Sequence, residues 1–543
     1  MKPPFTIWPV ALSAFVLTIF VGVAASNVST QYYEHYSYDP DPSSGLLHNI
    51  QAYDKVQKYG RWVAFSHELT SNPRDPLAYA PIILLAPALL KSRTAHLFVL
   101  LPYFFLFLFF LGYRVVVNHA IILAIAWQFS FATVLVIFAP YFGIGFHLPD
   151  AIASYPLALA GFSLLFWMEG KRLFWVSVFA LMISLAVLTR YIFSVYAFAV
   201  FAPIIIYTVF SGYKKQTAFV AIKPVLIMAA IIALTCGHYI FKNFEYNFNY
   251  YTYWAGKKSA TLNYDLSFSI KTFFLGFGSF FGPFHAVILL TAFGWFFFRT
   301  AKMKDRKGLG LLAIIFWFCL AMPFIWVFLL KSNGLKVTSS FLAAFPITFV
   351  AIAEGSKALP LIGRWRVGAT IFIVLLSSAS FARYYGKALS ASLNASKEMT
   401  QRKQFLVISA AILNSLKNSD LKLIDLSSKY LAEALACEVF YRHGKVVDVS
   451  MGSLLFRQGG QFWQKNYSNT NDDEVGRYIF NQIDTSYHVV FTNAASLNES
   501  KNYETETAFK IASKIKKLLI SSNHWFKEPS LSSQEVDVYF KMK

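Results

Sequence analysis

Long apolar runs alternate with short polar segments over roughly the first 390 residues of the chain. The first run, 5–25, is long enough to cross a hydrocarbon core of about 30 Å, and similar runs follow at 95–112, 119–139, 150–168, 173–189, 192–210, 223–241, 283–298, 308–330, 337–354 and 367–385. Lys2 precedes the first run and no clear small-residue cleavage site ends it, so we expect an uncleaved span with its amino end in the cytoplasm. The pattern predicts a polytopic α-helical membrane protein with about 11–13 transmembrane helices.

The apolar run 77–90 decides the topology. It carries Pro81 and Pro87 and is shorter than the roughly 17–25 residues that a spanning helix needs. If it does not cross, the basic loops all face the cytoplasm, namely Arg114, Lys171–Arg172, Lys214–Lys215, the cluster in 299–307, Lys357, Arg364 and Arg366. If it crosses, the 299–307 cluster falls outside. The positive-inside rule favours the first arrangement, with about eleven crossings and with the 33–81 loop and the carboxyl-terminal tail on the outer face.

The tail has the pattern of a soluble α/β domain. Residues 421–426 and 487–492 resemble buried strands, and 445–449 is a further candidate. In 506–520, Ile511, Ile515, Leu518 and Leu519 recur at helical spacing with lysines between them. We therefore expect a transmembrane module at 1–390, with an outer loop at 26–76, and an extracytoplasmic α/β domain at 400–543.

Composition excludes several classes of protein. With 56% hydrophobic and 14% charged residues, the chain has too few charges for a soluble protein of its size. The net charge of +21 does not indicate nucleic acid, because most basic residues before the tail lie in short loops, where they face anionic lipid head groups. Cys236, Cys319 and Cys437 have no CxxC spacing, so neither a disulfide framework nor a zinc site is indicated. A bacterial inner membrane is the location that we expect.

The polar, aromatic loop 33–81 is the first candidate for chemistry. It gathers carboxylates at Asp39, Asp41, Asp54, Glu68 and Asp75 between apolar runs. An ordered ionisable cluster at a bilayer surface is costly unless it binds something. A plain turn is the alternative for Asp-Pro-Asp-Pro, because both residue types favour turns.

The order of motifs resembles the GT-C superfamily of membrane glycosyltransferases, in the branch of the lipid A aminoarabinose transferases and protein O-mannosyltransferases. After the first span come Asp39-Pro40-Asp41, an amphipathic segment from Ala52 to Gly60-Arg61-Trp62, and Arg74-Asp75-Pro76-Leu77 with Tyr79. Then follow Leu148-Pro149-Asp150, Leu188-Thr189-Arg190-Tyr191, and Lys336 ahead of Pro346. The resemblance covers roughly residues 1–385. The chain departs from the family pattern at the proline between Asp39 and Asp41, at Asp75 in place of a proline, and in having no Glu-Lys-Pro.

The resemblance implies an inverting enzyme that takes a sugar from a polyprenyl-phosphate carrier. Asp39 or Asp41 is then the catalytic base, and Arg190 and Lys336, with Lys331 as a further candidate, bind the donor phosphate. Asp150, Asp75 and Glu68 are secondary acidic residues for the acceptor or for a metal ion, and a divalent metal cofactor is left open. The chemistry agrees, because the transfer needs a base near the acceptor hydroxyl and cations that hold the departing phosphate.

Each of these residues has a structural alternative. Asp150 begins a span and could serve only as a helix cap. Arg190, Lys331 and Lys336 could be snorkelling residues at a membrane face. Glu68 with His67 and His35 fits no known metal-site spacing.

Three classes of function stay open. The leading one is transfer from a polyprenyl-phosphate sugar to a glycan, lipid or protein acceptor on the extracytoplasmic face. An O-antigen polymerase or ligase is the second, although those enzymes usually carry their large outer loop late in the chain. A lipid-linked-sugar transporter or flippase is the third, and it would place polar sites at mid-membrane in two related halves, which are not visible.

Overall fold

The computed structural model describes residues 7–35, 40–72, 75–116, 121–138, 146, 149–213, 218–248, 266–303, 313–318, 338–359, 361–393, 397–415, 421–426, 431–450, 472–493, 506–529, 532 and 536–541. These residues form two compact units. Unit 1 comprises Met1–Gln31, Arg61–Leu89 and Thr94–Ala391. Unit 2 comprises Tyr32–Gly60, Leu90–Arg93 and Ser392–Lys543, so that part of the first outer loop groups with the tail.

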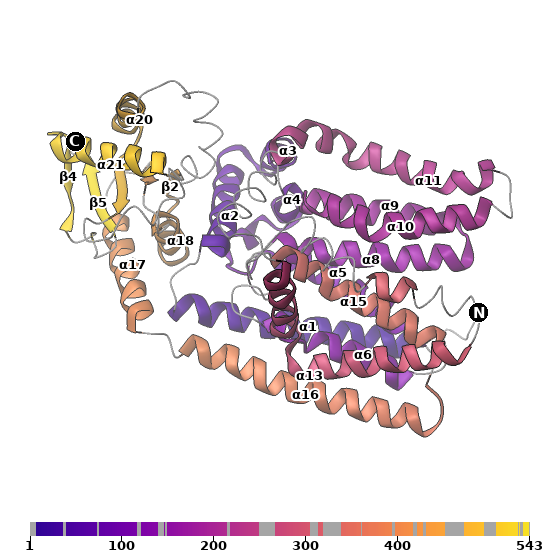
Figure 1. Ribbon diagram of the computed structural model, residues 1–543. Helices are drawn as coiled ribbons and strands as arrows, with labels where there is room; N and C mark the ends of the chain where they lie inside the picture. Colours follow the sequence, from indigo (N-terminus) through magenta and orange to yellow (C-terminus); the bar gives the residue numbers. More distant parts are fainter. Residues whose placement is uncertain are drawn as a thin grey trace. The chain divides into compact units, whose positions relative to one another are not determined.

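Unit 1 is a helical bundle (Figure 1). Its elements are most of α1 (Ile7–His35), then α3 (Arg61–Ser71), α4 (Pro76–Leu85), the start of the 3₁₀-helix η2 (Pro87–Lys91), α5 (Leu97–Val116), α6 (Ile121–Ala132), α7 (Leu135–Phe138), α8 (Pro149–Gly170), α9 (Leu173–Thr189), α10 (Phe193–Tyr213), α11 (Ala218–Ile232), the π-helix η3 (Ala233–Gly237), α13 (Leu266–Met303), α15 (Thr338–Ala358) and α16 (Arg364–Leu393).

The predicted polytopic helical fold is confirmed. Within the described residues, seven helices are long and apolar enough to cross a membrane: Ile7–Glu34, Leu97–Val116, Pro149–Gly170, Phe193–Phe210, Ile222–Phe248, Phe281–Lys302 and Arg364–Ser390. Each covers one predicted span. The predicted spans 173–189 and 337–354 are the helices α9 and α15. Most of the predicted span 308–330 lies outside the described residues.

Helix α8 is the centre of this bundle. It is buried over nearly its whole length and packs against α5, α9 and α15 (Figure 1). Small residues allow this close approach, because they let helix backbones come near one another. At Gly161, an added Cβ would already touch Val350 of α15 at 3.4 Å.

The predicted span 119–139 is broken, and buried polar groups explain how the break is tolerated. Helix α6 ends at Ala132 and the short α7 begins at Leu135. The Ser130 carbonyl oxygen lies 2.8 Å from His285 Nε2, and the Ser380 hydroxyl donates to the Thr133 carbonyl oxygen at 3.2 Å. Backbone groups released at such a break need internal partners, and α13 and α16 supply them here.

The run 77–90 forms no long helix. Its residues lie in the ten-residue helix α4 and in the 3₁₀-helix η2, separated at Ala86. At about 1.5 Å per residue, α4 is about 15 Å long, which is half of a hydrocarbon core. The helix α4 is therefore too short to span by itself, and the topology stays a prediction.

A buried ion cluster joins α5, α8 and α15 at one end of the bundle. Arg114, whose side chain is 1% exposed, donates to both carboxylate oxygens of Glu169 at 2.7 and 2.8 Å and to Glu354 at 3.0 Å. Lys357 also contacts Glu169. Arg114 and Lys357 were both predicted to face the cytoplasm, and the structure places them at the same end of the bundle. A guanidinium suits this place because it can bind a carboxylate through two parallel bonds.

Unit 2 contains a small α/β domain. Five strands, β1 (Lys422–Asp425), β2 (Asp448–Ser450), β3 (Val489–Asn493), β4 (Trp525–Lys527) and β5 (Val536–Lys541), form a sheet of order β2-β1-β3-β5-β4. β1 pairs in parallel with β2 and β3, and β5 pairs antiparallel with β3 and β4. The three predicted strands and the helix predicted at 506–520 are present, whereas β4 and β5 were not predicted.

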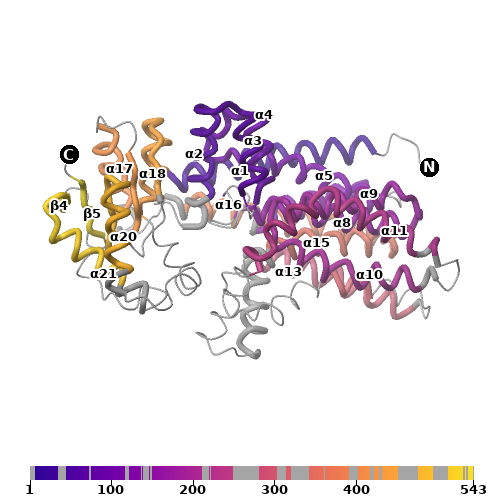
Figure 2. Tube along the Cα trace, turned by 90° about the horizontal axis from the view of Figure 1, so that it is seen from above, coloured from indigo at the N-terminus to yellow at the C-terminus, as the bar shows by residue number. Residues whose placement is uncertain are grey.

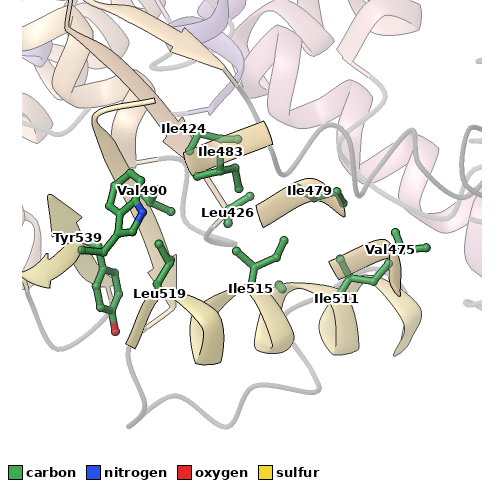
Figure 3. Packing of buried hydrophobic residues seen from close by; sticks show 12 residues of the cluster. Ile424, Leu426, Val475, Ile479, Ile483, Val490, Ile511, Ile515, Leu519 and Tyr539 are labelled. Carbon is green, nitrogen blue, oxygen red and sulfur yellow. The ribbon is translucent and has the colours of Figure 1, made fainter. Parts of the chain in front are cut away.

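The sheet and two helices bury a common core (Figure 3). Helices α20 (Asp472–Ser486) and α21 (Glu506–Ser521) contribute one apolar face each, and the strands contribute Ile424, Val490 and Tyr539. Isoleucines at helical spacing on α20 and α21 produce these faces, with Ile479 and Ile483 on the first and Ile511 and Ile515 on the second. The remaining helices of the unit are α2 (Pro40–Tyr59), α17 (Lys397–Ser415) and α18 (Leu431–His443).

The first prediction concerns topology. A fluorescent protein that matures only in the cytoplasm should stay dark when fused after Lys543 and should fluoresce when fused after Met303, beside the basic residues of 299–307. Fluorescence of the Lys543 fusion in whole cells would contradict an extracytoplasmic tail. Immunoblots confirm that both fusions accumulate.

The second prediction concerns the buried ion cluster. Arg114→Gln leaves Glu169 and Glu354 close together without their guanidinium, and unpairing a buried charge typically costs about 3–5 kcal/mol. We expect a correspondingly lower stability of the purified protein, measured by SDS-induced unfolding. Arg364→Gln, at an exposed arginine, is the matched control and should change little. Equal stabilities of the two variants would contradict the role given to Arg114.

Candidate functional site

The hairpin of α8 and α9 brings two predicted site residues to the same end of unit 1. Asp150 lies in the first turn of α8, and Arg190 directly follows the last residue of α9. The turn at Lys171 and Arg172 joins the two helices at their other ends. Because packed helices joined by a short turn run antiparallel, the start of the first meets the end of the second.

Arg190 lies between two carboxylates. Its Nε donates to Asp150 Oδ1 at 3.2 Å, and its NH1 lies 3.5 Å from Asp75 Oδ2. The side chains of Arg190, Asp75 and Asp150 are 16%, 16% and 11% exposed, so the cluster is mostly shielded from solvent and still accessible. The backbone of Arg190 is extended at the helix end, with φ −158° and ψ 114°, and this directs the chain from α9 toward α10.

Asp75 occupies the N-cap position of α4, but its carboxylate does not cap that helix. Pro76 follows it at the start of the helix, where the missing N–H of proline costs nothing. The carboxylate instead faces Arg190. The capping alternative stated for Asp150 and the snorkelling alternative stated for Arg190 both stay open.

A hydrogen-bonded chain connects Glu68 to the same cluster. Glu68, on α3, is buried, and its Oε1 accepts a hydrogen bond from the Asn72 side chain at 2.6 Å. The Asn72 Oδ1 in turn accepts a hydrogen bond from the backbone N–H of Asp75 at 3.1 Å. Asn72 thereby fixes the Asp75 backbone relative to α3. Glu68 and Asp75, which are near each other in the chain, thus connect with the distant Asp150 and Arg190 in one polar cluster.

Other groups surround this site on the same side of the bundle. The Lys242 ammonium donates to the Thr70 carbonyl oxygen at 2.7 Å, which ties the helix following η3 to α3. The ring of Tyr191, which follows Arg190 in the chain, lies 6.2 Å from that of Tyr239 between centroids.

The described residues at this cluster do not fit a divalent metal ion. Asp75 and Asp150 would be the oxygen ligands, but the Arg190 guanidinium already lies between them. A dication bound there would sit against the guanidinium, and repulsion between like charges disfavours that arrangement. Arg190 supplies the positive charge at this cluster.

The remaining predicted residues are not placed. Asp39, Lys331 and Lys336 lie outside the described residues. Asp41 lies in the first turn of α2, and its side chain is outside the described part. The roles of these four residues therefore stay predictions.

Sequence reasoning missed Asn72 and Lys242. The spacing of Glu68 and Asn72, four residues apart, places both on one helix face, and an Asn three residues before Asp75 is typical of a local side-chain turn. These signals are weak by themselves. The contact of Lys242 with Thr70 has no local signal, because it joins segments far apart in the sequence.

No protein-family model matches the chain, and no curated protein matches it. Solved structures are similar in fold. An archaeal oligosaccharyltransferase, AglB from Archaeoglobus fulgidus in complex with an inhibitory peptide and a dolichol-phosphate, matches with a TM-score of 0.46 and 11% identity over 96% of this chain and 73% of that one. An oligosaccharyltransferase of Archaeoglobus fulgidus in complex with zinc and sulfate matches with a TM-score of 0.46 and 11% identity, over 88% of this chain and 68% of that one. The arabinofuranosyltransferase AftD from Mycobacteria matches with a TM-score of 0.41 and 9% identity, over 96% of this chain and 40% of that one. All three are enzymes of glycosyl transfer by name.

Proposed function

We propose that this protein is an inverting membrane glycosyltransferase. It moves a sugar from a polyprenyl-phosphate carrier to a lipid, glycan or protein acceptor on the extracytoplasmic face. The observation that carries the proposal is the position of Arg190, held between Asp75 and Asp150 at the end of the α8–α9 hairpin.

Arg190 is suited to bind the donor phosphate. Its contacts to Asp150 and Asp75, at 3.2 and 3.5 Å, are longer than the 2.7–2.9 Å typical of bonds between a cationic N–H and an anionic oxygen. A phosphate oxygen can therefore replace the weaker contact, to Asp75, without removing Arg190 from Asp150. The released Asp75 carboxylate is then available to accept hydrogen bonds from sugar hydroxyls.

The proposed transfer is one displacement. A carboxylate of Asp39 or Asp41 takes the proton of the acceptor hydroxyl, and the acceptor oxygen forms a bond to the anomeric carbon. The bond between that carbon and the phosphate oxygen breaks, and the polyprenyl phosphate leaves with the electron pair. Arg190, with Lys336 as a second predicted cation, stabilises the negative charge that develops on the phosphate. One base suffices for inversion by a single displacement.

The position of the ionisable cluster favours transfer over transport. Asp75, Asp150 and Arg190 lie at the ends of α4, α8 and α9 rather than midway along them. A transporter binds its substrate near the bilayer midplane. The direct test is incubation of the purified protein with a panel of polyprenyl-phosphate sugars, with mass spectrometry of carrier and acceptor. Absence of transfer with every donor would contradict the proposal.

The third prediction concerns the donor phosphate. Arg190→Gln should lower kcat/KM for the donor roughly 10-fold to 150-fold, because the loss of a charge-assisted hydrogen bond raises the free energy of the transition state by about 1.5–3 kcal/mol. Arg172→Gln, at the other end of the same helix, is the matched control and should act like the wild type. Donor titrations at fixed acceptor measure the effect. Unchanged kcat/KM in Arg190→Gln would leave Arg190 with a structural role only.

The fourth prediction concerns the base. Asn in place of Asp keeps the shape of the side chain but cannot accept the proton. The rate of transfer should therefore fall by about 100-fold to 10,000-fold when the Asp that acts as the base, Asp39 or Asp41, is replaced. The stiffness given by Pro40 and Pro42 helps to hold such a base within reach of its substrate. Asp39→Asn, Asp41→Asn and the double variant are compared at equal membrane expression. Near-normal transfer by the double variant would exclude Asp39 and Asp41 as the catalytic base. Asp75, Glu68 and Asp150 would then be the next candidates for the base.

A further inference from the structure

The backbone of Asp75 is held from three sides. Its N–H donates to Asn72 Oδ1 at 3.1 Å, and its carbonyl oxygen accepts a hydrogen bond from the Ala78 N–H at 3.1 Å. Pro76 follows it directly at the start of α4, and the proline ring fixes the φ angle there. The Asp75 carboxylate therefore moves toward Arg190 mainly by rotation about its own side-chain bonds.

Asn72 is in turn fixed to α3 by two hydrogen bonds to Glu68. Its backbone N–H donates to the Glu68 carbonyl oxygen at 3.2 Å, and its Nδ2 donates to Glu68 Oε1 at 2.6 Å. A carboxylate oxygen accepts and a backbone N–H donates, so the amide must turn its Nδ2 to Glu68 and its Oδ1 to Asp75. An aspartate of the same shape would keep the bond to Asp75 but would face Glu68 with a second carboxylate.

Helix α3 gives this pair of residues a firm base. Glu68 is buried, with 3% of its surface exposed, and α3 packs against α4, which lies next to it in Figure 2. Near the end of α3, the Thr70 carbonyl oxygen accepts a hydrogen bond from the Lys242 ammonium at 2.7 Å. All of these residues belong to unit 1. The position of Asn72 is therefore set by contacts other than that between Asp75 and Arg190.

The contact that this arrangement leaves between Asp75 and Arg190 is long. The NH1 of Arg190 lies 3.5 Å from Asp75 Oδ2, whereas a cationic N–H and an anionic oxygen typically approach to about 2.7–2.9 Å. Opposite charges at a partly buried site attract one another, so an unrestrained carboxylate would move closer. The restraint on the Asp75 backbone thus keeps the two groups apart and leaves the guanidinium able to bind another anion.

We propose that Glu68 and Asn72 are positioning residues that hold Asp75 back from Arg190 and so keep the guanidinium open to the donor phosphate. The inference rests on the proposed function for the identity of the anion. The hydrogen bonds on which it depends can be tested without any donor.

The test measures binding of farnesyl phosphate, a short polyprenyl monophosphate, to the purified full-length protein by calorimetry. Farnesol is the reference without phosphate. Asn72→Ala removes both side-chain bonds, so that Asp75 moves closer to Arg190 and competes better with the phosphate. The dissociation constant for farnesyl phosphate should rise about threefold to tenfold, the size of one ordinary hydrogen bond, and that for farnesol should not change.

A matched control is available in unit 1. Asn243 is also partly buried, and its side chain donates to the Tyr239 carbonyl oxygen of its own helix at 3.0 Å. Asn243→Ala should bind farnesyl phosphate and farnesol like the wild type.

Two further comparisons distinguish positioning from general damage. In an Asp75→Asn background no carboxylate competes for Arg190, so Asn72→Ala should have no additional effect there. Exchanging the two groups by combining Glu68→Gln with Asn72→Asp restores an amide–carboxylate pair, and the new carboxylate still accepts from the Asp75 N–H. This double variant should bind farnesyl phosphate like the wild type and more tightly than Asn72→Asp alone. If Asn72→Ala does not fold, this last comparison decides.

The outcomes separate the inference from the proposed function. Hydrogen–deuterium exchange at the Asp75 amide should rise in Asn72→Ala and return to the wild-type rate in the exchanged pair. Unchanged exchange, or unchanged affinity for farnesyl phosphate, would overturn the positioning role. An effect of Asn72→Ala that persists in the Asp75→Asn background would overturn it as well. Farnesyl phosphate that binds the wild type no better than farnesol would contradict the proposed phosphate site, and the exchange rates would still decide whether Asn72 holds Asp75.

Discussion

The antiparallel pairing of α8 with α9 is the constraint on which unit 1 depends. It brings Asp150 and Arg190 together at one end of the pair, while Glu169, near the end of α8, meets Arg114 and Lys357 at the other. Small side chains along α8 let α5, α9 and α15 approach it closely. Each end of this central helix is thus fixed by charges, and its middle is fixed by packing.

The two ends use charge differently. At Arg114, the bonds to Glu169 are short and the guanidinium is almost completely buried, as befits a structural tie. At Arg190, the contacts are longer and the side chains partly exposed. Under the proposed function, this difference is what would let the donor phosphate reach the Arg190 guanidinium.

Unit 2 depends on another buried charge. The Lys403–Glu438 pair sits between two helices of the tail and reaches the carbonyl that ends α1. The apolar core under the sheet is separate from this pair and consists of isoleucines, valines and aromatic residues (Figure 3). Unit 2 therefore has an apolar core under the sheet and a separate charged contact at the end of α1.

The sequence by itself determined the class of the protein and much of its organisation. The apolar runs predicted the long helices, and short apolar runs and helical spacing predicted three strands and α21, because these signals are local. The short run 77–90 with its two prolines was the doubtful span, and it forms α4 and η2. Motif order indicated Asp75, Asp150 and Arg190 as candidates, and Glu68 was a candidate as a carboxylate of the outer loop. Only the tertiary structure decided that Arg190 is shared by Asp75 and Asp150, that Asn72 links Glu68 to them, and that Lys403 closes α1. Those contacts join residues far apart in the chain, or depend on side-chain direction, and no local pattern encodes either.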